Sequence, residues 1–110
     1  MAYIQVVTTT PSEEEAQRIA QTLVQRRLAA CVQVSGPIES TYRWQGAIEC
    51  SREWVCTAKT RRERFDDAAR AIRECSSYQV PEILALPIAE GSADYLAWID
   101  AEVGESGTGD

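Results

Sequence analysis

The residues best suited to chemistry in this 110-residue sequence are four cysteines and one short polar stretch. The cysteines stand at positions 31, 50, 56 and 75, without the Cys-x-x-Cys spacing typical of metal or redox sites. The chain contains no histidine, so it lacks the commonest general base and the commonest metal ligand. Without a nucleophile paired to such a base, the sequence predicts a protein that is not an enzyme.

Each cysteine has a structural interpretation beside the chemical one. Cys50 and Cys56 fall on the same strand face as Trp54, and we expect both in the core. Cys31 opens a strand and is also expected to pack. Cys75 ends the inner stripe of a helix beside two serines. Two interpretations stay open for it, a metal-binding thiolate and an inert buried thiol.

The polar stretch is Tyr78–Ile83, which places a phenol, an amide and a carboxylate where a helix should give way to a strand. Loops at such junctions often carry function, although this composition also suits an ordinary turn. Two further carboxylates, Glu49 and Glu53, are expected to point outward along a strand. There they would be solvated or form salt bridges between subunits.

The elements that must position these residues are organised around one long β-hairpin between Cys31 and Thr60. Apolar and polar side chains alternate along both arms with the period of two that is typical of strands. We predict a three-residue loop ending at Gly46, because it pairs Tyr42 with Ile48 and keeps the two faces consistent.

The length of this hairpin predicts an oligomer. An arm of about 14 residues spans roughly 45 Å, whereas a compact chain of this length is only about 34 Å across. The hairpin should therefore overhang its domain or bend, and Gly36-Pro37 offers a break. Overhanging strands expose backbone and apolar side chains that proteins usually cover with a partner.

The remaining elements complete a ferredoxin-like fold. Residues 3–9 predict a buried strand, residues 83–88 predict another, and Ser92 should cap a last helix. Capping boxes at Ser12 with Glu15 and at Thr60 with Glu63 predict the starts of two earlier helices. The order βαββαβ plus a helix indicates an α+β ferredoxin-like sandwich. We expect one domain over residues 1–103 and a disordered tail over 104–110.

Composition narrows the choice of partners and location. The formal net charge is -6 and no basic run occurs, so we expect no nucleic-acid partner. No basic leader or long apolar stretch is present, so we expect no signal peptide and no membrane association. With free thiols, this predicts a cytoplasmic protein.

Residues 77–87 resemble the signature of the CutA divalent-cation-tolerance family, and the resemblance extends over residues 3–102. The other matching segments, in order, are Leu28–Val32, Tyr42–Gly46, Lys59-Thr60 and Asp94–Trp98. The resemblance implies a ferredoxin-like subunit in a homotrimer that is similar in architecture to the PII signalling proteins. The trimer contacts it implies are Tyr42, Trp44 and Trp54. The polar groups it implies for an intersubunit ligand cleft are Lys59, Tyr78 and Glu82.

The resemblance also bears on metal binding. Family members usually carry histidine at the position of Ser76, some carry histidine at that of Cys75, and some carry cysteine at that of Thr8. These are the family's proposed copper ligands, and here only Cys75 remains a soft donor. We therefore expect any site for divalent copper or another divalent cation to be weak and to use Cys75.

Two functional hypotheses follow. The first is a trimer involved in the response to, or tolerance of, divalent metal ions, with binding weakened by the absence of histidine. The second is a PII-like sensor or interaction module that binds a small ligand between subunits.

Overall fold

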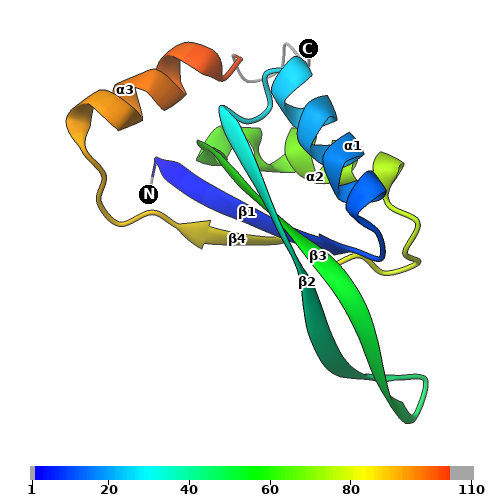
Figure 1. The fold of residues 1–110 in the computed structure, drawn as a ribbon. Helices are drawn as coiled ribbons and strands as arrows, with labels where there is room; N and C mark the ends of the chain where they lie inside the picture. Colours follow the sequence, from blue (N-terminus) through cyan, green and yellow to red (C-terminus); the bar gives the residue numbers. More distant parts are fainter. Residues whose placement is uncertain (1, 105–110) are drawn as a thin grey trace.

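The computed structural model describes residues 2–104 and has the predicted order of strands and helices (Figure 1). The strands are β1 (Tyr3–Thr10), β2 (Cys31–Trp44), β3 (Ala47–Arg61) and β4 (Leu84–Pro87). The helices are α1 (Glu13–Gln25), α2 (Phe65–Cys75) and α3 (Ala93–Glu102), with a 3₁₀ turn at Arg62–Arg64. Apart from Gly104, the predicted disordered tail lies outside the described residues.

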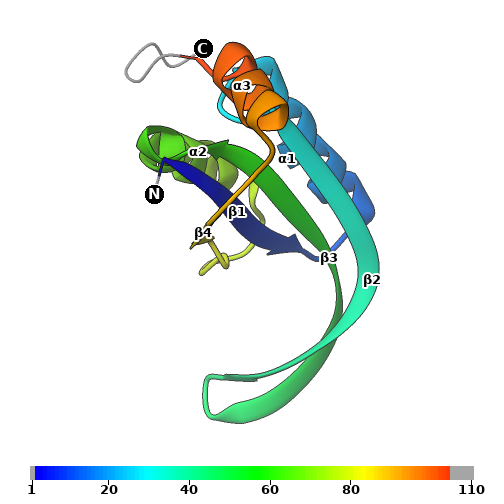
Figure 2. The same ribbon diagram turned by 90° about the vertical axis from the view of Figure 1, so that its left-hand side faces the viewer.

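The strands form one antiparallel sheet in the order β2-β3-β1-β4. Helices α1 and α2 pack together on one face of this sheet (Figures 1 and 2). The core between them includes Val6 of β1, Ile19 and Leu23 of α1, Ala58 of β3 and Ile72 of α2. This arrangement confirms the predicted ferredoxin-like α+β fold. No helix within residues 2–104 is long and apolar enough to cross a membrane.

The hairpin overhangs the domain as its length predicts. Strand β1 pairs with β3 only from Trp54 to Arg61, so the earlier residues of β3 pair with β2 alone. We call residues 38–53 the distal hairpin, and Figures 1 and 2 show it projecting from the sheet and curving. It gives the chain a longest dimension of 44 Å against 27 Å and 22 Å in the other directions.

The predicted three-residue loop is wrong. Trp44 pairs with Ala47 and Tyr42 pairs with Glu49, which leaves a two-residue loop at Gln45 and Gly46. Both loop residues have positive φ, 50° and 85°, as in the turns whose twist matches that of the flanking strands. The prediction failed because it required consistent faces, whereas residues 41–50 are exposed on both faces in this chain.

The predicted break at Gly36-Pro37 is confirmed. The β2–β3 register shifts between Ser35 and Ile38, and Gly36 has a φ of 148°. A β-carbon at Gly36 would lie 2.7 Å from Cδ1 of Trp54, so the indole occupies the space that a side chain would need. The bulge therefore separates the distal hairpin from the part of the hairpin that belongs to the sheet.

Of the two predicted capping boxes, the second does not form, and the first forms only the hydrogen bond made by its serine. The Ser12 hydroxyl accepts a hydrogen bond from the Glu15 N–H at 3.1 Å, as predicted, and begins α1. The Thr60 hydroxyl instead donates to the Leu28 carbonyl at 2.7 Å, and Thr60 stays within β3 opposite Ile4. Because pairing with β1 continues to Arg61, α2 starts later, at Phe65, and the second capping box is wrong.

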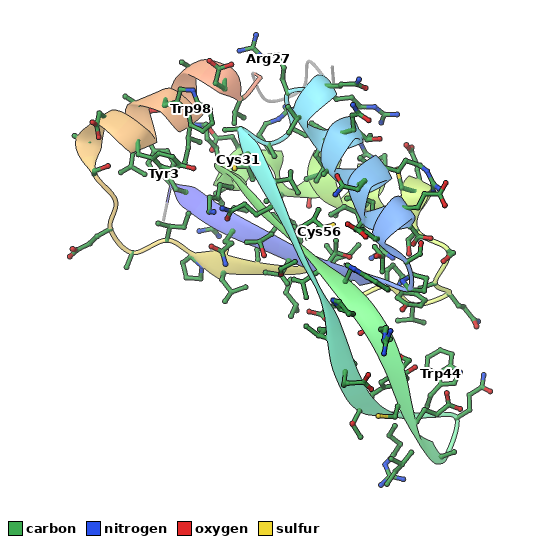
Figure 3. The ribbon with its side chains drawn as sticks, in the orientation of Figure 1. Tyr3, Arg27, Cys31, Trp44, Cys56 and Trp98 are labelled. Atoms are coloured by element: carbon green, nitrogen blue, oxygen red, sulfur yellow. The ribbon has the colours of Figure 1, made fainter. Side chains whose placement is uncertain are left out.

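Arg27 connects the ends of α1 and α3. It follows α1 in the left-handed conformation, with a φ of 58°. Its Nη2 donates to the Ala101 carbonyl at 2.7 Å and its Nε donates to the Glu102 carbonyl at 3.0 Å (Figure 3). The guanidinium thus caps carbonyl groups at the end of α3, a helix that buries Ile99 and is followed by the buried Val103.

Candidate functional site

A cavity of about 610 Å³ lies between the distal hairpin and the segment that follows α2. We call it the hairpin cavity. Thr9 at the end of β1 contributes to its wall, together with residues of both hairpin strands and of the segment 77–82. The lining residues are Thr9, Ser40, Thr41, Tyr42, Trp44, Glu49, Glu53, Ser77, Tyr78, Gln79, Val80 and Glu82. It brings together side chains far apart in the sequence.

The segment after α2 is held in place by a buried carboxylate of α1. Glu15 is only 6% exposed, and its Oε2 accepts a hydrogen bond from the Ser77 N–H at 3.0 Å. The Ser76 hydroxyl accepts another from the Tyr78 N–H at 3.1 Å. Sequence reasoning missed the first contact because it assigned Glu15 to a capping box. The signal was its spacing, since Glu15 lies four residues before the core residue Ile19.

Tyr78 and Glu53 form the central polar contact of the cavity. The Tyr78 hydroxyl donates to Oε2 of Glu53 at 2.6 Å. Burial, and after it the hydrogen bond to this carboxylate, raises the pKa of Tyr78 well above its usual value. Tyr78 therefore stays a neutral hydrogen-bond donor over the physiological pH range.

Glu53 does not point outward into solvent, which was one of the two roles expected for it, and the other, a salt bridge between subunits, stays a prediction. Its exposed fraction is 9%, whereas the neighbouring lining residue Glu49 is exposed as expected. Residue Glu53 pairs with Ile38 at the base of the distal hairpin, where the loop carrying Tyr78 covers the strand. Strand alternation predicts two faces but not that a distant loop covers the outward one.

The structure brings together four of the seven predicted site residues. Tyr78 and Glu82, predicted for the ligand cleft, line the hairpin cavity with Tyr42 and Trp44, which were predicted as trimer contacts. Lys59 is not among the lining residues, because it lies near the other end of the hairpin. There, opposite Cys31, its ammonium donates to the Gln33 side chain.

The other two predicted residues lie elsewhere. Trp54 is half-buried beside Gly36 and packs against the core. The half-buried Cys75 has its Sγ 3.8 Å from the Thr22 hydroxyl of α1, and its thiol donates there. It is not among the residues that line the hairpin cavity.

The cysteines do not gather into a metal site. Within residues 2–104 no group of three or more cysteine, aspartate and glutamate side chains is placed to hold a metal ion. The residues around Cys75 therefore fit a tightly bound divalent cation poorly, because affinity requires several ligands held together.

The prediction that Cys50 and Cys56 both lie in the core is correct for one of them. Cys56 is buried as predicted, donates to the Ala16 carbonyl, and burial raises the pKa of its thiol to about 11. Cys50 was also predicted to be in the core, but it is exposed on the distal hairpin, 3.4 Å from the Thr41 hydroxyl. The strand face that buries Cys56 continues past the domain to Cys50, where neither the helices nor any other part of residues 2–104 buries it.

Comparisons with known proteins agree on one family. The family model for the CutA1 divalent ion tolerance protein matches residues 4–102. The divalent-cation tolerance protein CutA of Thermus thermophilus is 43% identical over 99 residues, covering 90% of this chain and 96% of that protein. That of Archaeoglobus fulgidus is 43% identical over 95 residues, covering 86% and 92%.

Solved structures show the same likeness. The Thermus thermophilus structure has a TM-score of 0.90 at 42% identity, covering 93% of this chain and 99% of that one. The CutA1 structure from Oryza sativa has a TM-score of 0.93 at 35% identity, covering 96% and 97%. The chain therefore belongs to the CutA1 divalent ion tolerance protein family.

Proposed function

We propose that this chain acts as a homotrimer in the response to, or tolerance of, divalent metal ions of the copper type. The observation that carries the proposal is the family match over residues 4–102. The relatives from Thermus thermophilus and Archaeoglobus fulgidus are both described as divalent-cation tolerance proteins. The proposed role is non-catalytic, because a chain without histidine lacks the most frequent general base.

The trimer is supported by apolar surface that the single chain leaves open. Tyr42, Trp44 and Ile48 of the distal hairpin are 39%, 37% and 69% exposed. On the opposite edge of the sheet, Leu84 and Leu86 of β4 are 54% and 46% exposed. Contacts between copies at Tyr42 and Trp44 would cover the overhang, and the half-buried Trp54 next to its base is the third proposed contact. An open strand edge such as β4 can pair with a strand of another copy. Light scattering behind a sizing column tests this, and a stable monomeric mass at micromolar concentration would rule out the trimer.

The proposed metal contact is weak and centred on Cys75. Its thiolate would be the strongest ligand, with glutamate or tyrosine oxygens as poorer partners for copper. Binding should weaken as pH falls, because protons compete with the metal for the thiolate.

Calorimetric titration with Cu²⁺ tests the metal contact in the wild type, Cys75→Ser and Ser76→His. Ser76→His adds an imidazole beside the thiol, so its affinity should rise roughly tenfold. Cys75→Ser should bind more weakly than the wild type. Parallel titrations with Zn²⁺, which does not oxidise thiols, control for redox chemistry. Equal affinity in all three proteins would refute both the Cys75 assignment and the importance of the missing histidine.

The hairpin cavity supports a second candidate function, a PII-like module that binds a small ligand in an intersubunit cleft. Its volume of about 610 Å³ suits a small organic molecule, and Tyr78 and Glu82 supply polar groups. Lys59 would join this cleft only if a neighbouring subunit brought it there. A thermal-shift screen separates the two functions, because a ligand that binds only the native state raises the unfolding temperature. Stabilisation by metals alone would favour the first candidate, and by organic molecules alone the second.

We also place the protein in the cytoplasm. The four cysteines are all free in the structure, as expected in a reducing compartment. The Archaeoglobus fulgidus structure is described as that of a periplasmic protein, so the periplasm is the alternative location. Cell fractionation distinguishes the cytoplasm from the periplasm.

A further inference from the structure

The hairpin cavity is lined by carboxylates and aromatic rings and by no basic side chain. Glu49, Glu53 and Glu82 contribute three carboxylates, and none of the twelve lining residues is lysine or arginine. The remaining polar side-chain groups in its wall are hydroxyls, the Gln79 amide and the Trp44 indole N–H, which carry no charge. The cavity therefore concentrates negative potential in a partly enclosed volume, where it attracts cations more strongly than an open surface does.

Glu53 is a buried carboxylate without an ion-pair partner among residues 2–104. It is more than nine-tenths buried. One of its oxygens, Oε2, accepts the Tyr78 hydroxyl. Its other oxygen, Oε1, has no hydrogen-bond partner among the described residues and is not one of their buried unpartnered atoms, so it is open to the cavity. A cation in the cavity would therefore find a carboxylate oxygen free to accept its hydrogen bonds, on a side chain that is otherwise shielded from water.

The aromatic rings favour a particular kind of cation. Tyr42 and Trp44 lie two residues apart on one face of β2, and Tyr78 faces the same cavity from the other wall. The faces of such rings attract ammonium and guanidinium groups, most strongly where water is displaced. Figure 3 shows Trp44 near the end of the distal hairpin, and it is one of the residues that line the cavity.

A bare metal ion fits this cavity less well. The carboxylates are spread around a volume of about 610 Å³, and no three acidic groups converge on one point within residues 2–104. Divalent cations need several oxygen ligands at about 2.0–2.6 Å. An organic cation instead contacts separate carboxylates and rings at once.

We propose that the hairpin cavity binds an organic cation whose ammonium or guanidinium group pairs with Glu53 between the aromatic rings. This inference rests on the second candidate function, the ligand cleft, and specifies the chemical class of its ligand. Glu53 supplies the buried charge, Tyr78 fixes the position of that carboxylate, and Tyr42 and Trp44 cover the bound group. Glu82, which is exposed, adds a second carboxylate for a ligand with two positive groups.

The test uses two small molecules of the same shape, butylguanidinium, which is charged, and butylurea, which is neutral. Both are titrated calorimetrically into the full chain and into Glu53→Gln. Glutamine can still accept the Tyr78 hydrogen bond but lacks the charge. We expect the wild type to bind butylguanidinium at least about tenfold more tightly than butylurea, because the charged pair is buried. Glu53→Gln should lose that preference.

Matched controls accompany the titrations. Glu90→Gln makes the same charge change at an exposed position outside the cavity and should leave both affinities unaltered. If Glu53→Gln does not fold, Glu82→Gln at an exposed position replaces it and should weaken butylguanidinium binding several-fold. Light scattering measures the molar mass of every variant, so that weaker ligand binding can be distinguished from dissociation of the proposed trimer.

Equal affinity for the two molecules would overturn the proposal while leaving the ligand cleft intact. Retention of the full preference in Glu53→Gln would overturn it as well. Binding of Cu²⁺ without any binding of butylguanidinium would also overturn it, and would leave the divalent-cation function standing.

Discussion

Replacing Arg27 separates two effects that act at the same residue. The wild-type side chain caps α3, and the wild-type backbone holds a β-carbon in the left-handed region at a φ of 58°. Arg27→Ala removes the cap and keeps the backbone cost. Arg27→Gly removes the cap and relieves that cost, because glycine adopts positive φ readily.

The expected magnitudes follow from the contacts. The two guanidinium hydrogen bonds lie on an exposed side chain, so their loss in Arg27→Ala should cost about 1 kcal/mol. Relief of the left-handed conformation in Arg27→Gly should return about 1 kcal/mol. For a domain of this size, the alanine variant should melt about 4–8 °C below the wild type. The glycine variant should melt close to the wild type.

Thermal unfolding at one fixed protein concentration measures both variants, because the melting temperature of the proposed trimer would depend on concentration. Hydrogen exchange at the Val103 amide, which donates to the Ile99 carbonyl at 3.0 Å, reports the end of α3 directly. It should speed up in both variants, since both lose the cap. A glycine variant no more stable than the alanine variant would refute the backbone argument. An alanine variant as stable as the wild type would refute the capping argument.

Trp44→Ala should weaken the proposed trimer by roughly 2 kcal/mol, as loss of a central aromatic anchor does, and Val24→Ala on α1 should not. Light scattering over a dilution series measures this, and unchanged dissociation would contradict an anchoring role. Hydrogen bonding to the Tyr3 hydroxyl, and after it to Arg61, lowers the pKa of Asp100, so its ionised form stabilises the fold at neutral pH. The advantage of the wild type over Asp100→Asn should therefore be full at about pH 6, decline once the pH falls below the unfolded pKa of about 3.9, and be lost as the folded carboxyl itself protonates at lower pH. A constant difference across that range would contradict the assignment. Glu15→Ala should accelerate hydrogen exchange at the Ser77 amide, and equal exchange in the wild type would show that the buried carboxylate does not hold the loop.

The periodicity of apolar residues predicted most of the fold, because burial of one face of each helix or strand produces that periodicity. Residues such as Ile19 and Ile72 recur at helical spacing since each helix covers a single sheet face, and both are 1% exposed. The overhang also followed from strand length alone. The register at the loop could not be predicted from the hydrophobic pattern, because residues 41–50 are exposed on both faces. Only the turn residues determine the pairing there.

The candidate site was only partly predictable for a different reason. Tyr78 and Glu82 come from one short segment with a recognisable pattern, so sequence could single them out. Glu53 depends on a loop 25 residues away in the chain that buries it, and local alternation cannot contain that information. Lys59 was grouped with the cleft through resemblance, but its strand position places it away from the hairpin cavity in this chain.

The two-residue turn at Gln45 and Gly46 has a consequence for the order of events in the proposed trimer assembly. Every strand pairing in the distal hairpin joins residues close in sequence, from Trp44 with Ala47 out to Ile38 with Glu53. Such local contacts form within microseconds, and here they extend a ribbon already anchored to a sheet. The ribbon should therefore be complete before two copies meet. Each of the two encounters that build the proposed trimer would then be a second-order step, at rates typical of preformed surfaces, with no slow folding step after encounter.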